Sequence, residues 1–228
     1  MKNTTVKSLF SLKKITYVVL VLGFVTAVAT PFNSSNNIMQ PAKEPIAENK
    51  KIIHPIVDKE KIQADNIREK ESAEAFKEAY KVLMHPRCMN CHPSGDAPLQ
   101  GDDSHIHDQN VTRGKDGKGV YAMKCSNCHQ KENTAGLNMP PGNPNWHLPP
   151  ANMKMVFQGR TPAQLAAQFK DRKLTGKTLQ EMLHHVEEDK LVLGGWDPGE
   201  GRTKPPLSHA EFAAKFREWI EKGAVIPK

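Results

Sequence analysis

Residues 88–92 spell CMNCH and residues 125–129 spell CSNCH, so the chain carries the pattern C-x-x-C-H twice. Cysteines separated by two residues can both add to the vinyl groups along one edge of a porphyrin, and the histidine that follows then lies over the iron. The chain has four cysteines in all, and both pairs are used here. The spacing therefore predicts two covalently attached c-type haems. Cys88, Cys91, Cys125 and Cys128 would be the attachment points, with His92 and His129 as proximal iron ligands.

A four-cysteine zinc site is the alternative interpretation, because two C-x-x-C pairs roughly thirty residues apart also make a zinc ribbon. Histidine accounts for 10 of 228 residues, so its chance occurrence directly after both pairs has a probability of about 1 in 500. A zinc ribbon has no use for these two histidines. The pattern therefore favours haem, and the export signal described below favours it further.

The composition predicts a fold with many loops. The chain has 17 Pro and 15 Gly but only 3 Trp, 3 Tyr and 8 Phe, which is a small apolar inventory for one domain or two small ones. Two buried macrocycles would supply the missing apolar surface. We therefore expect a mostly α protein with long loops, similar to cytochrome c, in which two haems pack between short helices.

The net charge gives no reason to expect nucleic acid as a partner. It is +7, and four of these seven charges belong to Lys2, Lys7, Lys13 and Lys14 near the N-terminus, which leaves +3 for the rest. An excess this small does not make the basic surface that phosphate recognition needs. We expect a protein partner instead.

Residues 1–29 are predicted to be a secretory signal peptide. Four lysines precede an apolar run over residues 15–29, and Ala27-Val28-Ala29 fits a small-x-small cleavage site. The run is shorter than the roughly 20 residues of a membrane-spanning helix. The alternative is an uncleaved anchor that tethers the protein to the membrane. Both readings export the body of the protein, so we expect a periplasmic location.

A flexible linker is expected over residues 30–64, because they are rich in Asn, Ser, Pro, Lys and Glu without a sustained apolar period. The dihaem cytochrome domain would then occupy residues 65–228. Asn66 and Glu69 have the spacing of an N-cap and capping box, which predicts that the first helix begins there. Pro86 would end this helix just before the first haem motif.

The segment between the motifs contains the first candidates for a distal iron ligand, since each haem iron has a second axial position. His105 and His107 differ by two residues, so in an extended segment both point to the same side. One would bind iron while the other packs nearby, and we prefer His107. The alternatives are a polar loop with solvated histidines, or a small metal site formed with Asp102, Asp103 and Asp108.

Further candidates follow the second motif. Met139 lies only ten residues after His129, a short loop for reaching the opposite face of the same haem. His147 lies in a segment rich in Trp and Pro, which is stiff and apolar and suits packing on a porphyrin. Met153 and Met155 are thioether alternatives, although methionines near a macrocycle are more often core filler. We rank His147 first and Met153 second.

The last third of the chain is predicted to be helical. Thr161, Thr178 and Ser208 are each followed three residues later by Gln or Glu, which is the capping-box pattern. Gly223 would stop the last helix. His185 flanks the apolar face of the middle helix and could reach a haem, but a surface role is the more common one.

Four segments resemble a family of exported dihaem cytochromes, often described as the cytochrome subunit of isoquinoline 1-oxidoreductase-type molybdenum hydroxylases. They are HPRC (85–88), QGDDSHIH (100–107), WHL (146–148) and GWDPG (195–199). The first and last helices also resemble those of class I cytochromes, where the C-terminal helix packs across the N-terminal one. The resemblance implies a redox partner containing molybdenum and iron–sulfur clusters, from which electrons pass to the respiratory chain.

The expected function is single-electron transfer by a dihaem cytochrome, which requires no acid, base or nucleophile. The alternative is a haem enzyme or ligand-binding protein with one open iron site, either peroxidase-like or gas-binding. A sensor module would also need an open site, but nothing in the chain resembles a sensor's output domain.

Overall fold

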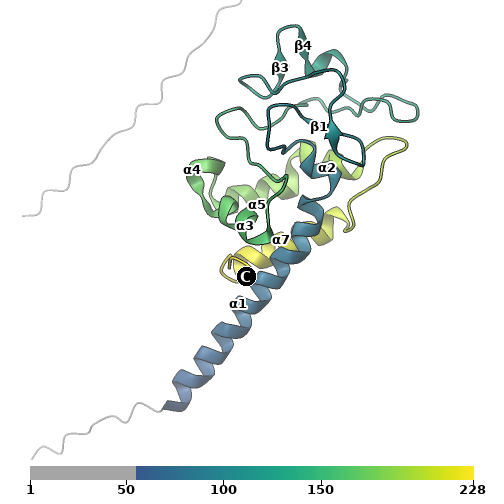
Figure 1. The fold of residues 1–228 in the computed structure, drawn as a ribbon. Helices are drawn as coiled ribbons and strands as arrows, with labels where there is room; N and C mark the ends of the chain where they lie inside the picture. The colour runs from purple at the N-terminus through teal and green to yellow at the C-terminus, as the bar shows by residue number, and fades with distance from the viewer. Residues whose placement is uncertain (1–54) are drawn as a thin grey trace, which may run out of the picture. The chain divides into compact units, whose positions relative to one another are not determined.

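The computed structural model describes residues 55–228, which are mostly helical with a few very short strands (Figure 1). The predicted signal peptide and the predicted linker up to residue 54 lie outside this range. The helices are α1 (Pro55–Leu83), α2 (Pro86–Met89), α3 (Pro162–Lys170), α4 (Arg172–Thr175), α5 (Leu179–Glu188), α6 (Lys190–Leu193) and α7 (His209–Glu221), with 3₁₀ turns η1 (Cys125–Asn127) and η2 (Gly194–Trp196).

Helix α1 begins eleven residues before the predicted start, so the prediction of a helix beginning at Asn66 is wrong. The segment before Asn66 is rich in Lys, Glu, Gln, Ala and Ile, and most of these residues have good helix propensity. Residues 55–64, expected to belong to the linker, are therefore helical. Almost all side chains from 58 to 71 are exposed, and this part of α1 extends beyond the packed body (Figure 1).

The hydrophobic core lies where the C-terminal part of α1 meets α3, α5 and α7. Phe76 of α1 packs against Trp219 of α7 with ring centroids 4.7 Å apart, and Phe169 of α3 meets Phe216 of α7 edge to face at 5.2 Å. All four side chains are almost completely buried. The last helix therefore packs against the first, which is the arrangement that the resemblance to class I cytochromes implies.

The three predicted capping boxes are confirmed. Thr161, Thr178 and Ser208 each accept a hydrogen bond from the backbone N–H three residues later, and the Gln or Glu at that position accepts one in return. Helix α7 ends at Glu221, and Gly223 follows in a left-handed conformation with φ of 109°. Local sequence thus fixes the ends of the helices that make the core.

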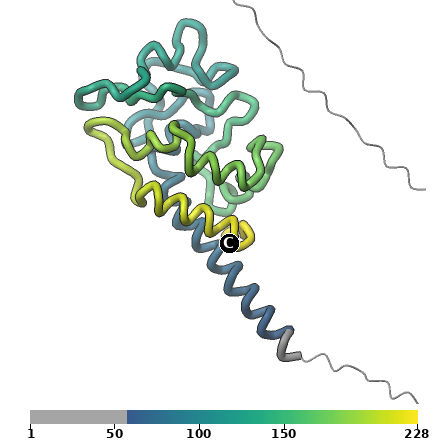
Figure 2. Tube along the Cα trace, turned by 180° about the vertical axis from the view of Figure 1, so that it is seen from behind, coloured from purple at the N-terminus to yellow at the C-terminus, as the bar shows by residue number. Residues whose placement is uncertain are grey.

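Residues 90–161 contain no α-helix and form the other end of the body (Figures 1 and 2). Two small antiparallel hairpins are their regular structure: β1 (Leu99–Gln100) pairs with β2 (His105–Ile106), and β3 (Gly119–Val120) pairs with β4 (Met123–Lys124). The buried residue Arg113 connects these loops. Its side chain is 1% exposed and donates to the carbonyl oxygens of Pro149 (2.5 Å) and Gly95 (3.2 Å).

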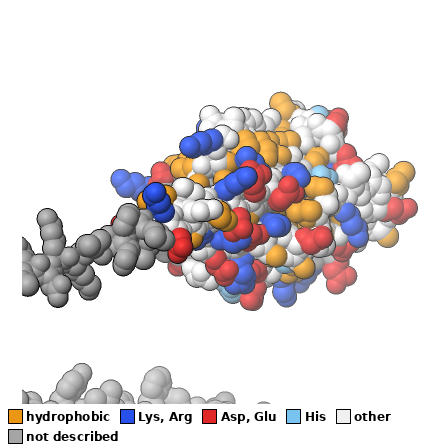
Figure 3. All heavy atoms as spheres, turned by 90° about the horizontal axis from the view of Figure 1, so that it is seen from below, with side chains coloured by type: hydrophobic (Ala, Val, Ile, Leu, Met, Phe, Trp, Pro, Cys, Tyr) orange, Lys and Arg blue, Asp and Glu red, His pale blue; other side chains and the backbone are white. Residues whose placement is uncertain are grey.

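Charges of both signs are mixed on the face drawn in Figure 3, so no large patch of one sign appears there. No helix within residues 55–228 has the length and apolar character needed to cross a membrane.

Candidate haem site

The first C-x-x-C-H motif lies on and just after the short helix α2. Pro86 occupies its first turn, and the side chain of His85 caps it by accepting a hydrogen bond from the Arg87 N–H (3.3 Å). The backbone N–H groups of Cys91 and His92 then bond to carbonyls three residues earlier. Helical turns bring residues three and four apart to one side, so the two thiols and the imidazole of this motif share a face.

His92 is held by two groups that lie far from it in the sequence. Its Nδ1 lies 2.6 Å from the carbonyl oxygen of Met155, and its ring stacks on Phe157 with centroids 3.9 Å apart and planes at 5°. The Phe157 N–H in turn donates to the His92 carbonyl at 2.9 Å. The segment 155–157 therefore fixes both the tautomer and the ring plane of this histidine.

The second motif is built in the same way. It begins with the 3₁₀ turn η1, and the His129 N–H donates to the Cys125 carbonyl at 2.9 Å. The Nδ1 of His129 lies 2.7 Å from the carbonyl oxygen of Pro141, and its ring stacks on Trp146 at 4.0 Å and 8°. The stacked aromatic residue and the carbonyl again come from the segment that follows the motif.

This shared construction has a chemical consequence. A histidine whose Nδ1–H is donated to a carbonyl presents the lone pair of Nε2, and metal-binding histidines are commonly oriented by such a bond. Burial lowers the pKa of His92 to about 4, so its imidazole is neutral at pH 7 as an iron ligand must be. Burial also lowers the pKa of His129.

The thiols of the first motif stay protonated at neutral pH. Burial raises the pKa of Cys88 to about 12 and that of Cys91 to about 11, and burial also raises the pKa of Cys125. The four cysteines form no disulfide in the structure. They are therefore available as free thiols, which is the form that adds to vinyl groups.

A cavity of about 460 Å³ lies in front of the second motif, within the size range of sites for small molecules and cofactors. Its walls include Cys125, Cys128 and His129, together with Cys91 of the first motif. Leu99, Val111, Leu148 and Leu191 add apolar surface. The two motifs therefore face a common region rather than opposite ends of the protein.

His107 faces His129 across this cavity. The two ring centroids are 6.4 Å apart, and two imidazoles on opposite sides of one metal, with bonds of about 2.0–2.1 Å, have centroids roughly 6.3 Å apart. The Nδ1 of His107 is buried and has no hydrogen-bond partner, and burial lowers the pKa of this histidine. The thiols, the proximal His129 and the opposing His107 together fit a c-type haem.

His105 has a different environment from His107. Its side chain is exposed, its Nδ1 lies 2.6 Å from an Asp103 carboxylate oxygen, and Asp108 lies 3.8 Å from its Nε2. The extended pairing continues past strand β2, since the His107 N–H donates to the Pro98 carbonyl at 3.1 Å, but of the two histidines His107 alone lines the cavity. His105 belongs to the surface.

His147 is not brought to the cavity, although its neighbours Trp146 and Leu148 line it. Its Nδ1 lies 2.6 Å from the Asn145 carbonyl oxygen. Burial lowers the pKa of His185 and the nearby His147 lowers it further, while His185 contributes in the same direction to the low pKa of His92. His147 and His185 therefore interact electrostatically, and neither lines the cavity in front of the second motif.

Met153 is half-buried at the Gly176 turn, where its sulfur would lie 2.8 Å from a Cβ added to that glycine. It comes two residues before the Met155 carbonyl that holds His92, and it does not line the cavity in front of the second motif.

No group of three or more His, Cys, Asp and Glu side chains in the part of the chain described here is arranged to hold a metal ion. A four-cysteine zinc site would require such a group, as would a site formed by His105, His107 and the neighbouring aspartates.

Comparisons of the chain with protein-family models, with curated proteins and with solved structures find no match. The class of protein is therefore inferred from the site itself.

Proposed function

We propose that this protein is a dihaem c-type cytochrome that carries single electrons. The observation that carries the proposal is the duplicated proximal site. Each C-x-x-C-H histidine has its Nδ1 on a backbone carbonyl and its ring stacked on an aromatic side chain. A zinc ribbon has no need of this second layer, whereas an axial iron ligand does.

A bound haem would supply an iron that gains and loses one electron, and the protein's residues would hold its surroundings constant. The carbonyls of Met155 and Pro141 fix the Nδ1–H of each proximal histidine, while Phe157 and Trp146 fix the ring planes. His107 would close the sixth position of the haem at His129. A site closed on both sides excludes other ligands and suits electron transfer.

The partner and the location follow from the sequence resemblance and the predicted export signal. We propose that the protein works in the periplasm, free or tethered by residues 1–29. There it would accept electrons from a molybdenum and iron–sulfur dehydrogenase and deliver them to the respiratory chain. Such a partner would meet it through a small, transient interface of the kind used by redox proteins.

The direct experiment is the mass of the denatured protein, purified from cells able to attach c-type haem. The expected mass is that of the processed chain plus two haems. A variant with Cys125 and Cys128 changed to Ala should carry one haem, and a bare chain in the wild type would overturn the proposal. The ferric near-infrared band and the EPR spectrum then distinguish His/His from His/Met ligation.

A second candidate function is supported by one asymmetry between the sites. Among residues 55–228, His129 has a histidine facing it at an axial spacing, whereas the ring packed against His92 is Phe157 alone. An open iron at the first motif would bind peroxide or a diatomic gas. Carbon monoxide added to the reduced protein separates the candidates: a pure electron carrier binds none at neutral pH, whereas an open first haem binds one equivalent.

If the wild type binds none, single variants identify the ligand of the first haem. His147→Ala and His185→Ala are the two to compare, since His185 contributes to the low pKa of His92 and His147 to that of His185. The variant that gains carbon monoxide binding has lost the ligand. Met153→Leu should gain none.

A further inference from the structure

Every buried polar side-chain atom that lacks a hydrogen-bond partner in residues 55–228 lies between positions 87 and 113. These atoms are Arg87 Nε, Asn90 Oδ1, Ser104 Oγ, His107 Nδ1 and Arg113 Nε. An unpaired buried polar group destabilises a folded protein, and more so if it is charged. Such groups are few in folded proteins and indicate a partner that the protein atoms do not provide. The segment that holds the first haem motif is where that partner would lie.

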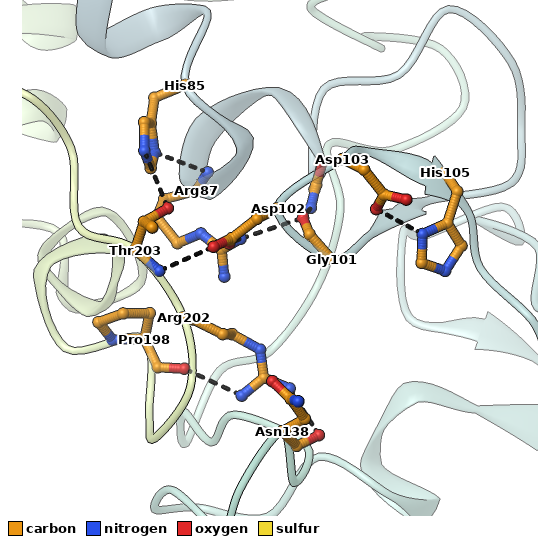
Figure 4. Close-up of polar contacts among 11 residues, drawn as sticks. His85, Arg87, Gly101, Asp102, Asp103, His105, Asn138, Pro198, Arg202 and Thr203 are labelled. Carbon is orange, nitrogen blue, oxygen red and sulfur yellow. Dashed lines mark hydrogen bonds and ion pairs between the residues drawn. The ribbon is translucent and has the colours of Figure 1, made fainter.

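Arg87 is the most informative of these residues because it is cationic and lines the cavity. Its side chain is 8% exposed. One guanidinium nitrogen, Nη2, donates to the Gly101 carbonyl (3.1 Å) and to Asp102 (2.5 Å), as Figure 4 shows. Asp102 is itself held by the Thr203 N–H at 3.0 Å. One edge of the guanidinium is therefore fixed, while its Nε–H has no acceptor.

Arg202 is a second cation on the wall of the same cavity. It donates to the carbonyl oxygens of Asn138 (2.8 Å) and Pro198 (3.3 Å), which hold it in place (Figure 4). No carboxylate within the described part of the chain lies within 4.0 Å of it. Burial lowers the pKa of Arg87, and the like charge of Arg202 contributes to the same shift. Both arginines line the same cavity and lie in the same region of the fold (Figure 4).

The charge of the cavity wall calls for an anion. Arg87, Lys124 and Arg202 are its cationic residues, and Asp197 is its one carboxylate. Arg87 is paired with Asp102, whereas Arg202 is held by carbonyls and has no carboxylate partner among residues 55–228. Both guanidinium groups lie on this wall, and together they form a donor set that matches a carboxylate. A haem carries two propionate carboxylates on the edge opposite its vinyl groups, and these are its anionic groups.

We propose that Arg87 and Arg202 bind a propionate carboxylate of the haem attached to Cys125 and Cys128. The inference rests on the proposed function and adds to it a binding site for one end of the cofactor. Arg87 immediately precedes Cys88, so a residue of the first motif would anchor the haem of the second. The position of each haem would then depend on the other motif.

The test uses holoprotein whose haem propionates carry ¹³C in the carboxyl carbon, introduced by growing cells on labelled 5-aminolaevulinate. Redox-induced infrared difference spectra then separate propionate bands from those of Asp and Glu. Arg87→Gln should shift the ¹³C-sensitive carboxylate band and lower the midpoint potential of the second haem, because an uncompensated negative charge stabilises ferric iron. Arg87→Lys should keep the potential closer to wild type while still shifting the band.

Arg172→Gln is the matched control, because Arg172 is exposed on α4 and should change neither measurement. Arg202→Gln gives a second variant if Arg87→Gln does not fold, with the same expected direction. Labelled bands that are unchanged in both variants would overturn the inference. A midpoint potential that shifts when chloride or phosphate is added, with no change in the labelled bands, would also overturn it, because the arginines would then bind a free anion. The mass measurement keeps the two proposals apart, because a chain without haem refutes the proposed function itself.

Discussion

His105 and His107 differ in what they contact, although they are two residues apart. His107 lines the cavity opposite His129, whereas His105 pairs with Asp103 at the surface. If His107 closes the iron, His107→Ala should open one axial position and let the reduced protein bind one more equivalent of carbon monoxide than the wild type. Titration of the Soret band measures it.

His105→Ala is the control for this prediction and should leave carbon monoxide binding unchanged. Equal carbon monoxide binding by the two variants would mean that His107 is not an iron ligand. A gain in His105→Ala alone would restore the assignment that the structure argues against.

Arg113 is a second case in which a single side chain matters, because it joins two loops. It is almost completely buried and donates to the carbonyls of Gly95 and Pro149. Arg113→Ala would leave both carbonyls unpaired and a void beside them, at a cost of about 3 kcal/mol. Chemical denaturation of the holoprotein measures the change. Arg160→Ala, at an exposed side chain, should cost less than about 0.5 kcal/mol, and a similarly small loss in Arg113→Ala would contradict the role given to it.

Site residues that act through a particular side chain at a fixed spacing could be predicted from the sequence. Site residues that act only through their backbone carbonyl could not. The proximal histidines and the three capping boxes follow from local patterns, because each needs particular side chains at short separations. The carbonyls that hold His92 and His129 come from Met155 and Pro141. Every residue has a carbonyl, so no letter in the sequence marks these two. The stacked Trp146 had a weak signal, since it lies in the stiff Pro-rich segment after the second motif, whereas nothing in the sequence singled out Phe157.

At the scale of elements, Ser72 joins α1 to the end of α7. Its hydroxyl donates to the Trp219 carbonyl (2.8 Å) and accepts from the Val225 N–H (3.1 Å) in a site with no solvent exposure. Ser72→Ala would leave the Val225 N–H buried without an acceptor, so we expect a loss of about 2 kcal/mol in the free energy of unfolding.

The comparison for this variant is Gln63→Ala, on the exposed part of the same helix. It should change stability by less than about 0.5 kcal/mol. Urea denaturation followed by far-UV circular dichroism measures both. Equal losses would mean that the contact between α1 and α7 does not depend on Ser72.

The first helix shows where an element-level prediction failed. Asn66 and Glu69 have capping-box spacing, but the residues before them are helix formers and the helix continues back to Pro55. The contacts with α7 begin only at Glu71 and Ser72, and most side chains before them are exposed. Apolar residues recur at helical spacing from Ile67 onward, but Ile67 is 51% exposed whereas Phe76 and Ala79 are buried. Apolar spacing therefore marks neither the start of the helix nor the start of its packed part.

At the scale of the whole molecule, the packed helices and the two motifs occupy different parts of the fold. The core of α1, α3, α5 and α7 could be expected from periodicity, since all four segments have apolar residues at helical spacing and the last three also have caps. The course of residues 90–161 could not, because loops without period have no pattern to read. Their order comes from contacts such as Arg113 with Pro149, and from the cofactors we propose.

The closeness of the two motifs gives a prediction about the molecule as a unit. Cys91 of the first motif lines the cavity of the second, and Cys125 contributes to the raised pKa of Cys91. Two haems held by these residues should therefore interact electrostatically. Unit charges about 10 Å apart at an effective dielectric constant of about 20 interact by roughly 1.7 kcal/mol, which is about 70 mV for one electron.

A spectroelectrochemical titration measures this coupling. Reduction of one haem should make the other harder to reduce, so the wild-type curve should be broader than the sum of two single-haem variants. These are Cys88→Ala with Cys91→Ala, and Cys125→Ala with Cys128→Ala. Raising the salt concentration should reduce the extra width of the wild-type curve only slightly, because buried charges are screened less than exposed ones. A wild-type curve that superimposes on the sum would mean that the haems are too far apart to share the cavity. That result would also contradict the proposal that Arg87 binds the haem of the other motif.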